Sequence, residues 1–193
     1  VVGEGEVAIL NILAGERQPV LRGAIPQSYD VPDRELIKNH REIDLCQSMT
    51  GLRMTSFQSA RVCPLTCTFC AERIVTGKFH RTTNPVRIRQ PGELLDEIEK
   101  VTRDYRLDRF KFVDATWNTS LTKVEEFCAE KLRRQNRTPF ECNIHASFTS
   151  FEMFKLLRAS GCGQINVGCE TGSPKIHRLI RKGISVEKIR QVF

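Results

Sequence analysis

The sequence predicts an α/β fold in which a parallel sheet forms part of a (β/α) barrel. From residue 91 onward, segments with helical apolar spacing alternate with short apolar segments typical of buried strands. About four βα units are present, whereas a closed barrel needs about eight. The expected strand ends carry polar or ligand-competent residues in the stretches "CPLTCTFC", "VDATWN", "HASF" and "GCETGS". Because chemistry in such folds lies at the carboxyl ends of strands, we expect one site there.

The helices of this repeat are predicted from apolar spacing and capping residues. The helix over 91–106 has one apolar face, made of Leu94, Leu95, Ile98, Val101 and Tyr105. The other expected helices cover 121–135, 150–160 and 173–182, and a last one starts near Ser185. Capping boxes are expected at Thr122 with Glu125 and at Thr149 with Glu152. The strands expected in the barrel cover 53–60, 109–113, 140–145 and 164–168.

The residues before the repeat divide into two expected pieces. Residues 1–16 predict a strand end, a Gly-rich turn and a short helix. Residues 17–50 contain three prolines and little periodicity, so we expect a linker. Residues 51–193 form the expected barrel part. The chain opens on Val1 rather than Met, and we expect it to be a fragment.

Composition indicates a soluble, globular protein. Hydrophobic residues make up 40% and charged residues 27%. No apolar run approaches the roughly 18 residues of a membrane span, and no secretory leader is recognisable, so a cytoplasmic location is expected. The net charge of +7 concentrates at 131–134 and 178–182, where solvated helix faces are the favoured interpretation and an anionic ligand the alternative. A nucleic-acid partner is not expected, because basic residues are not interleaved with aromatic ones.

Three of the eight cysteines, Cys63, Cys67 and Cys70, fall in the spacing C-x3-C-x2-C. The other five are single, and we expect them to be buried free thiols. In a reducing compartment a tight cysteine group indicates metal or redox chemistry. Zinc would need a fourth ligand, for which His80 and Cys46 are candidates. A 4Fe–4S cluster held by three thiolates would instead leave one iron open.

The cysteine spacing, with Phe69 directly before the last cysteine, resembles the radical S-adenosylmethionine (radical SAM) superfamily. The resemblance implies a 4Fe–4S cluster on the three cysteines and SAM bound through its amine and carboxylate to the open iron. The cluster donates an electron, the sulfonium is cleaved, and a 5′-deoxyadenosyl radical removes a hydrogen atom from the substrate. Phe69 is expected near the adenine, with a core Phe as the alternative. Where the family often has Arg-Gly-Cys, this chain has Arg61-Val62-Cys63, a change expected to stiffen the loop.

The other strand ends carry further residues that the resemblance marks as SAM-binding. Asp114 is expected to meet the SAM amine, with a turn or cap role as the alternative. Trp117 is expected either to line the substrate space or to pack. The stretch "INVGCETGS" resembles the family segment G-I-E-S-G-S, so Gly168 is expected to allow close approach of the ligand. Glu170 is expected to accept hydrogen bonds from the ribose or amine, with a surface salt bridge as the alternative.

Two basic side chains complete the expected SAM site. His145 stands where many relatives have an arginine, and it is expected either to bind the carboxylate or to be a structural histidine. Lys182 follows the family's pattern of a basic residue before a glycine. It is expected either to reach the SAM carboxylate or to be solvated near a helix C-terminus.

The stretch "VVGEGE" before a helix and a Pro-rich segment resembles the cobalamin-binding subclass. Residues 1–16 would then be the end of a Rossmann-like cobalamin domain, in which Gly3 and Gly5 allow backbone approach to the cofactor. The cobalt-ligand motif D-x-H-x-x-G is absent. The implied protein is a methyltransferase or cyclase with a small-molecule substrate, an electron donor such as flavodoxin or ferredoxin, and cobalamin in its full-length form.

Two alternatives stay open. A methylthiotransferase or tRNA-modifying enzyme shares the core, but its N-terminal domain usually supplies further cysteines, and residues 1–45 contain none. A non-catalytic zinc-binding module is the second alternative. No individual catalytic residue is assigned from the sequence.

Overall fold

A sheet of four parallel strands lies at the centre of the computed structural model, which describes residues 2–3, 5–24, 31–72 and 86–193. The strands pair in the order β3, β6, β7, β8. Their bounds are Met54–Phe57, Arg109–Phe112, Phe140–Ile144 and Cys162–Val167. Because parallel neighbours need crossover connections, this order confirms the predicted βα units and the partial barrel.

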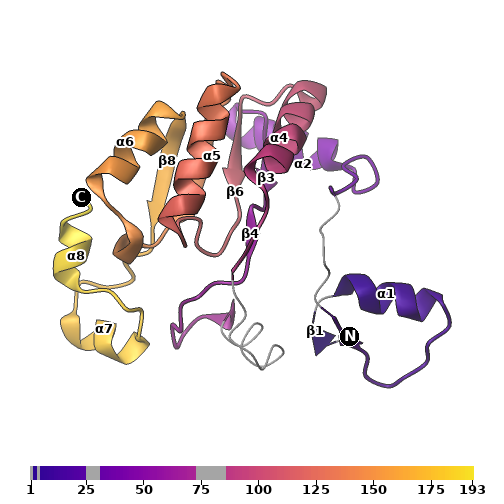
Figure 1. Cartoon of the computed structure of the whole chain (residues 1–193), viewed down its shortest axis with the longest axis horizontal. Coiled ribbons are helices and arrows are strands. Elements are labelled where there is room, and N and C mark those ends of the chain that lie inside the picture. Colours follow the sequence, from indigo (N-terminus) through magenta and orange to yellow (C-terminus); the bar gives the residue numbers. More distant parts are fainter. Residues whose placement is uncertain (1, 4, 25–30, 73–85) are drawn as a thin grey trace.

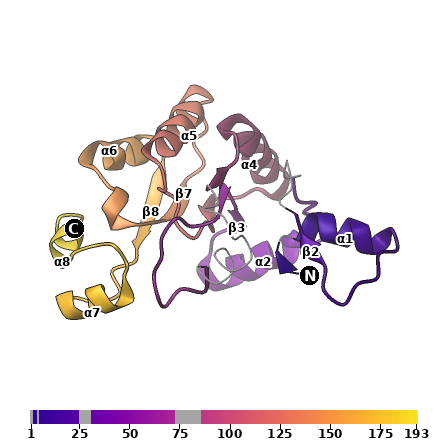
Figure 2. The ribbon, with the colours of Figure 1, turned by 60° about the horizontal axis from the view of Figure 1, so that its bottom comes forward.

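Three helices cover one face of this sheet, as Figure 2 shows. They are α4 (Pro91–Tyr105), α5 (Leu121–Arg133) and α6 (Phe151–Ala159). The short elements η1 (Ala146–Phe148), α7 (Pro174–Ile180) and α8 (Val186–Arg190) lie near the carboxyl ends of β7 and β8 (Figure 1). The carboxyl ends of the strands therefore point to the side of the molecule on which α7 lies.

Aromatic rings fill the space between the sheet and the helices. Phe112 of β6 contacts Trp117 at a centroid distance of 5.3 Å and Phe127 of α5 at 5.2 Å. Phe140 of β7 lies 5.7 Å from Phe110 of β6. Trp117 is completely buried in this cluster, so it packs and does not line a substrate space. Such ring pairs add to the stabilisation that burial of apolar area provides.

The opposite face of the sheet is polar. Arg109 of β6 forms an ion pair of 2.7 Å with Glu141 of β7. Asn143 of β7 accepts a hydrogen bond of 3.2 Å from Asn166 of β8. Strand residues alternate between the two faces, so the barrel interior carries the polar set and the helices cover the apolar one.

The N-terminal part lies to one side of the sheet (Figure 1). A parallel pair of two-residue strands, β1 (Val2–Gly3) and β2 (Arg22–Gly23), flanks α1 (Gly5–Leu13). Only Ala8 of the apolar set in α1 is buried, whereas Ile9, Leu10 and Leu13 are exposed. The spacing that predicted this helix therefore does not mark a buried face within the described chain.

The expectation that all of 17–50 is a linker is wrong for its last third. Residues Asn39–Thr50 form α2, which contacts β3 and ends at Gly51 in the left-handed conformation that glycine tolerates. Its buried side consists of only Asn39 and Ile43. A helix with so few apolar residues has no periodic stripe, and tertiary contacts decide its position. The division into three domains remains a prediction.

Two short strands frame the cysteine loop, and the sequence did not predict their pairing. β4 (Ala60–Arg61) pairs antiparallel with β5 (Arg87–Ile88). His80, which the sequence offers as a fourth zinc ligand, lies outside the described residues. The helix caps also differ from the expected boxes, because Ser120 and Ser150 accept hydrogen bonds from the backbone of Lys123 and Met153. A serine directly before the first helical residue caps better than a threonine one position inside or two positions away.

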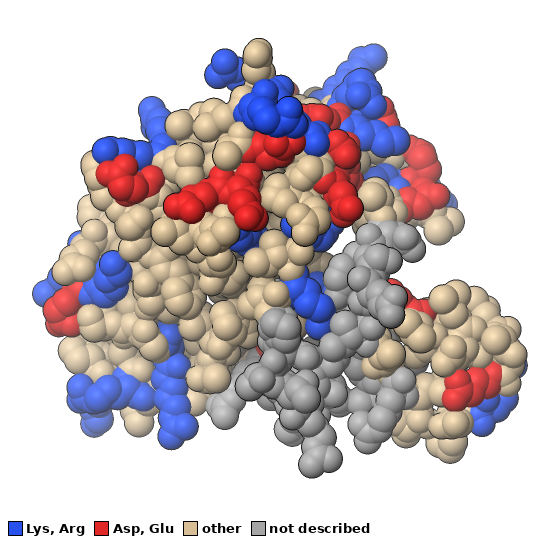
Figure 3. Space-filling view, in the orientation of Figure 1, with Lys and Arg blue, Asp and Glu red and all other residues tan. Residues whose placement is uncertain are grey.

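The basic run at 131–134 is neutralised within the protein. Lys131 is buried and donates to the carbonyls of Asn136 at 2.7 Å and Thr138 at 2.8 Å. Arg133 and Arg134 both form ion pairs with Glu130. Figure 3 shows acidic and basic residues intermixed over the outer helices. Across the described ranges, no helix is both long and apolar enough to cross a bilayer.

Candidate functional site

A cavity of about 510 Å³ lies at the carboxyl ends of three of the parallel strands, β6, β7 and β8. All nine residues that the sequence nominated line it: Cys63, Cys67, Phe69, Cys70, Asp114, His145, Gly168, Glu170 and Lys182. They come from the loop after β4, the ends of β6, β7 and β8, and the second residue after α7. The parallel arrangement therefore brings together side chains that are up to 119 positions apart, from Cys63 to Lys182.

The cysteine loop is held in place by backbone and side-chain contacts. Thr68 donates its backbone N–H to the carbonyl of Ile180 at 2.9 Å, which ties the loop to the end of α7. The N–H of Cys70 donates to the carbonyl of Cys67 at 3.2 Å and closes a tight turn. The sulfur of Cys63 lies 3.6 Å from Oγ1 of Thr116 in the loop after β6. The loop is thus fixed relative to the end of α7 and to the loop after β6.

The three thiols differ in exposure and share one electrostatic environment. Cys67 is buried, whereas Cys63 and Cys70 are half-buried, and all three are free. Burial raises the pKa of the Cys67 thiol, and the positive charge of Lys182 opposes that shift. Within the described part of the chain, no three His, Cys, Asp or Glu side chains converge on a position for a single metal ion. All three thiols line the large cavity.

Lys182 and Glu170 form an ion pair across the cavity wall. Lys182 is only 7% exposed, so it is not the solvated lysine of the alternative interpretation. Its ammonium lies 5.8 Å from the centre of the Phe69 ring, which is itself 54% exposed and so not a core residue. Glu170 has a φ of 60°, a left-handed conformation that turns the chain after β8.

The ion pair between Lys182 and Glu170 occupies the space where a side chain at Gly168 would lie. A Cβ atom at Gly168 would lie 2.6 Å from Nζ of Lys182 and 2.8 Å from Oε1 of Glu170. Both distances are shorter than side chains tolerate. The backbone of Gly168 is not in the left-handed region, so the reason for a glycine here is the close approach of these two side-chain ends, which an added Cβ would displace.

His145 ends β7 with a neutral ring. The backbone N–H of Ser147 donates to Nδ1 at 3.3 Å, which leaves the proton on Nε2. Nε2 is buried and has no hydrogen-bond partner among the described residues. Burial and, to a lesser extent, the charge of Lys182 lower the pKa of His145, although the nearby Lys182 carbonyl acts in the opposite direction. The Nε2–H group is therefore a buried donor without a well-formed hydrogen bond among the described residues, and the Lys182 carbonyl is a nearby acceptor.

The Asp114 carboxylate is engaged within the protein. It accepts hydrogen bonds from the backbone N–H groups of Ser59 at 3.0 Å and Ala60 at 2.6 Å, and from the Ser59 hydroxyl at 2.6 Å. The Lys123 ammonium lies 3.9 Å away. Burial raises the pKa of Asp114, and Lys123 opposes the shift. These contacts match the turn role that the sequence left open, and the contact with a SAM amine stays a prediction.

Sequence reasoning missed two side chains that support the site. Lys123, whose pKa burial lowers to about 8, lies under Asp114 and 5.4 Å from the Trp117 ring. Its signal was present in the sequence, because Lys123 falls on the apolar stripe of α5 with Val124 and Phe127. Thr116, which contacts Cys63, gave no comparable signal.

The fold and the cavity define a partial α/β barrel with a ligand site at the carboxyl ends of its strands. The chain belongs to the Radical SAM superfamily, a family of enzymes that use a 4Fe–4S cluster and SAM. The model of that superfamily matches residues 57–193, which include all three cysteines of the loop. The match confirms the family that the cysteine spacing suggested.

The chain matches only part of the length of each curated relative. The chain is similar to an anaerobic magnesium-protoporphyrin IX monomethyl ester cyclase of Cereibacter sphaeroides, with 30% identity over 127 residues. The alignment covers 64% of this chain and 20% of the cyclase. It is also similar to an uncharacterized methyltransferase of Pyrococcus horikoshii, with 22% identity over 203 residues. This alignment covers 96% of this chain and 43% of the methyltransferase. The chain thus spans less than half of these relatives.

Solved structures share the fold at low sequence identity. The radical SAM methyltransferase TsrM from Kitasatospora setae, with cobalamin and a [4Fe-4S] cluster bound, gives a TM-score of 0.62 at 19% identity. That alignment covers 88% of this chain and 29% of TsrM. The cobalamin-dependent SAM radical enzyme OxsB gives a TM-score of 0.55 at 18% identity, covering 69% of this chain and 20% of OxsB. Both comparisons support the partial barrel.

Proposed function

We propose that this chain carries the SAM-cleaving core of a cobalamin-dependent radical SAM methyltransferase or cyclase. One observation carries the proposal: the cysteine loop and the Lys182–Glu170 pair line the same cavity at the strand ends. The methyltransferase or cyclase type is supported by the names of the relatives. The methylthiotransferase and zinc-module alternatives have no supporting relative among those compared.

In this proposal Cys63, Cys67 and Cys70 hold the cluster. When bound, the cluster supplies an electron to the sulfonium of SAM, whose cleavage gives the 5′-deoxyadenosyl radical. The Lys182 charge favours the thiolate form of Cys67 against the effect of burial. The Thr116 hydroxyl beside Cys63 and the Thr68–Ile180 hydrogen bond keep the loop in place.

The Lys182–Glu170 pair is suited to an amino-acid group. SAM carries an ammonium and a carboxylate on one carbon, and the pair offers one group of each opposite charge. A ligand that inserts between them would exchange one ion pair for two charge-assisted contacts. Gly168 leaves the space in which the side chains can separate. We therefore assign Lys182 to the SAM carboxylate and Glu170 to the amine or a ribose hydroxyl.

Phe69 and His145 serve the remaining parts of SAM in this proposal. The exposed Phe69 ring lines the cavity and offers an apolar face to the adenine. The Nε2–H of His145 is buried and has no well-formed hydrogen bond among the described residues, so an acceptor atom of the ligand would satisfy it. Asp114 acts as a positioning residue, because it fixes Ser59 and Ala60 at the start of the cysteine loop.

The remaining components belong to the whole protein. We propose a small-molecule substrate, an electron-donor protein of the flavodoxin or ferredoxin kind, and cobalamin bound with the help of residues 1–16. Support for cobalamin is limited to the subclass resemblance and to the cofactors named for TsrM and OxsB. A cytoplasmic location is proposed on the cysteine chemistry alone.

Reductive cleavage of SAM tests the proposal. After anaerobic iron and sulfide loading, dithionite and SAM should yield 5′-deoxyadenosine and methionine. Cys67→Ala should abolish the yield, whereas Cys46→Ala, which changes a half-buried thiol on α2, should retain it. Cleavage by Cys67→Ala at the parent rate would show that the cluster is not held here.

A further inference from the structure

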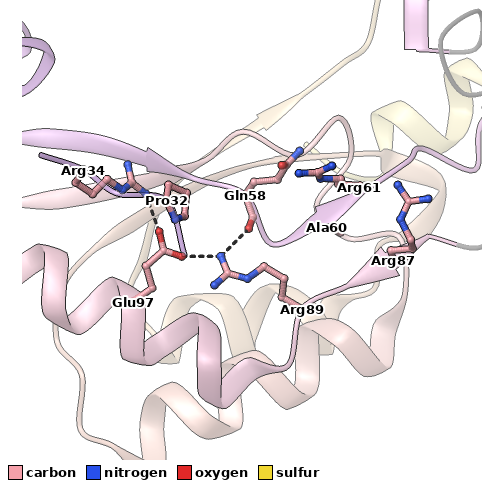
Figure 4. Close-up of a pocket in the computed structure, with 8 residues that line it drawn as sticks. All are labelled: Pro32, Arg34, Gln58, Ala60, Arg61, Arg87, Arg89 and Glu97. Carbon is pink, nitrogen blue, oxygen red and sulfur yellow. Dashed lines mark hydrogen bonds and ion pairs between the residues drawn. The ribbon is translucent and has the colours of Figure 1, made fainter. Parts of the chain in front are cut away.

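A second, smaller pocket lies between the cysteine loop and α4, and four arginines line it (Figure 4). Its volume is about 80 Å³. Its basic members are Arg34 before α2, Arg61 of β4, Arg87 of β5, and Arg89 just before α4. The remaining lining residues are Pro32, Gln58, Ala60 and Glu97. None of these residues lines the large cavity.

Glu97 is saturated by two of the arginines. Its Oε1 accepts from Arg34 at 2.9 Å and its Oε2 accepts from Arg89 at 2.6 Å. Glu97 is only 3% exposed, so the two ion pairs are almost completely desolvated. Arg89 also donates to the carbonyl of Gln58 at 3.3 Å, as the dashed lines in Figure 4 show. The Glu97 carboxylate thus keeps the guanidinium groups of Arg34 and Arg89 in the lining of this pocket.

The charges of the pocket do not balance within its described lining. Arg34 and Arg89 carry two positive charges against the single negative charge of Glu97. Arg61 forms an ion pair of 2.6 Å with Glu6 of α1, which is not part of the lining. The group formed by Glu97 and its two arginines therefore has a net charge of one positive unit. This count leaves out the other two arginines of the lining.

The pocket also contains an unused donor. Nε of Arg34 is buried and has no hydrogen-bond partner among the described residues. The other nitrogens of Arg34 donate to Asn39, Ser56 and Glu97. Burial lowers the pKa of Arg87 from its ordinary value, as expected for a cation without enough water around it. An anion in the pocket could accept a hydrogen bond from Nε of Arg34.

We propose that this pocket binds a tetrahedral oxyanion, namely a phosphate group. Guanidinium groups approach phosphate oxygens in pairs of hydrogen bonds, and the pocket lining carries four arginines against one carboxylate. A water molecule takes roughly 30 Å³ in the liquid, so the pocket has room for one such group and not for a nucleotide. The proposal does not depend on the proposed SAM chemistry.

Binding at this pocket would act on the cysteine loop. Ala60 and Arg61 directly precede the loop, and Ala60 donates to the Asp114 carboxylate at 2.6 Å. Arg87 and Arg89 lie on the other strand of the β4–β5 pair and just after it. A phosphate held by these groups would join the two strands that frame residues 62–86 and would bring in Arg34 from before α2.

Saturable stabilisation by phosphate tests the proposal on the full 193-residue chain. Unfolding temperature is measured against phosphate concentration at an ionic strength kept constant with chloride, with a calorimetric titration as the direct readout. Wild type should show a saturable increase. Arg34→Gln and Arg87→Gln should each weaken binding about tenfold, the effect of losing ~1.4 kcal/mol from one charge-assisted contact. Arg103→Gln, which changes an exposed arginine on α4, should not.

Three ligands separate the possible sources of the anion. Inorganic phosphate alone indicates a free ion, and binding of dimethyl phosphate as well indicates the phosphodiester of a larger cofactor. Acetate bound as tightly as phosphate would overturn the proposal in favour of a carboxylate site. Equal loss in Arg103→Gln, or no saturable heat with wild type, would show an internal ion-pair network only. The wild-type titration decides the question even where a variant does not fold.

Discussion

The ammonium of Lys182 pairs with the carboxylate of Glu170 beside Gly168, where an added Cβ atom would displace both side-chain ends. These residues come from the end of α7 and the loop after β8, and the three cysteines line the same cavity. The Lys182–Glu170 ion pair therefore lies beside Gly168, the glycine that the stretch "INVGCETGS" marked in the sequence. Its consequences can be measured one residue at a time.

Gly168→Ala should weaken SAM binding without unfolding the protein. The added methyl group displaces the ends of two flexible side chains, so the free energy of unfolding should change by less than ~1 kcal/mol. SAM affinity, measured by calorimetry on the cluster-loaded chain, should fall about tenfold because the pair is forced from its position. Gly172→Ala is the matched control, since nothing lies within 4 Å of its added Cβ. Equal affinities in the two variants would contradict the role of the pair.

Val62→Gly should be more stable than Val62→Ala. Val62 has a φ of 74°, and a β-branched residue in this left-handed region is strained by roughly 1–2 kcal/mol. Elsewhere alanine is normally the more stable of the two, because glycine loses more entropy on folding. Urea unfolding of both variants should therefore show the reverse order, by about 1 kcal/mol. An alanine variant that is the more stable would mean that the loop does not hold this conformation.

His145 should make the protein less stable in mild acid. Its folded pKa is below the ordinary 6.5, so below about pH 6.5 the unfolded chain binds more protons than the folded one. The free energy of unfolding should therefore fall as the pH decreases from about 6.5 toward the folded pKa. His145→Gln should lose less stability between pH 7.5 and 5.5, whereas His40→Gln, on the exposed side of α2, should behave as wild type. Parallel pH profiles in all three proteins would rule out this linkage.

Glu97→Gln should destabilise the fold and strengthen phosphate binding. The variant leaves two arginines without their shared carboxylate, and breaking a buried pair of this kind costs about 3 kcal/mol. Phosphate should restore part of that loss, so the unfolding temperature should respond more to phosphate than in wild type. Glu99→Gln, on the same helix and outside the pocket, is the control. A smaller phosphate response in Glu97→Gln would contradict an anion site beside Glu97.

The barrel elements were predictable because their signals are local. The apolar stripe of α4 appears in the sequence, and Leu94, Leu95, Ile98 and Val101 are buried as that stripe requires. Alternation of strands and helices then fixed a parallel sheet, which brought the nine site residues to one edge. The family pattern added the chemical role of residues such as Gly168, whose close neighbours no local pattern shows.

The remaining features depend on contacts between distant segments. α2 has one buried apolar residue, Ile43, so nothing periodic marked it. The β4–β5 pair consists of two residues on each side, too short for an alternating pattern. The three hydrogen bonds that the Asp114 carboxylate accepts from Ser59 and Ala60 join residues about 55 positions apart, so no local pattern marked them. Such pairings arise only once the sheet has formed.

Electron paramagnetic resonance of the reduced, iron-loaded chain tests the central claim most directly. Three thiolates around one cavity should hold a cluster of about four irons in which one iron has no protein ligand. SAM should then change the spectrum of the reduced cluster, and Lys182→Gln should weaken that effect at low SAM concentration. A colourless chain that retains one zinc ion, or a cluster spectrum that excess SAM leaves unchanged, would contradict the account.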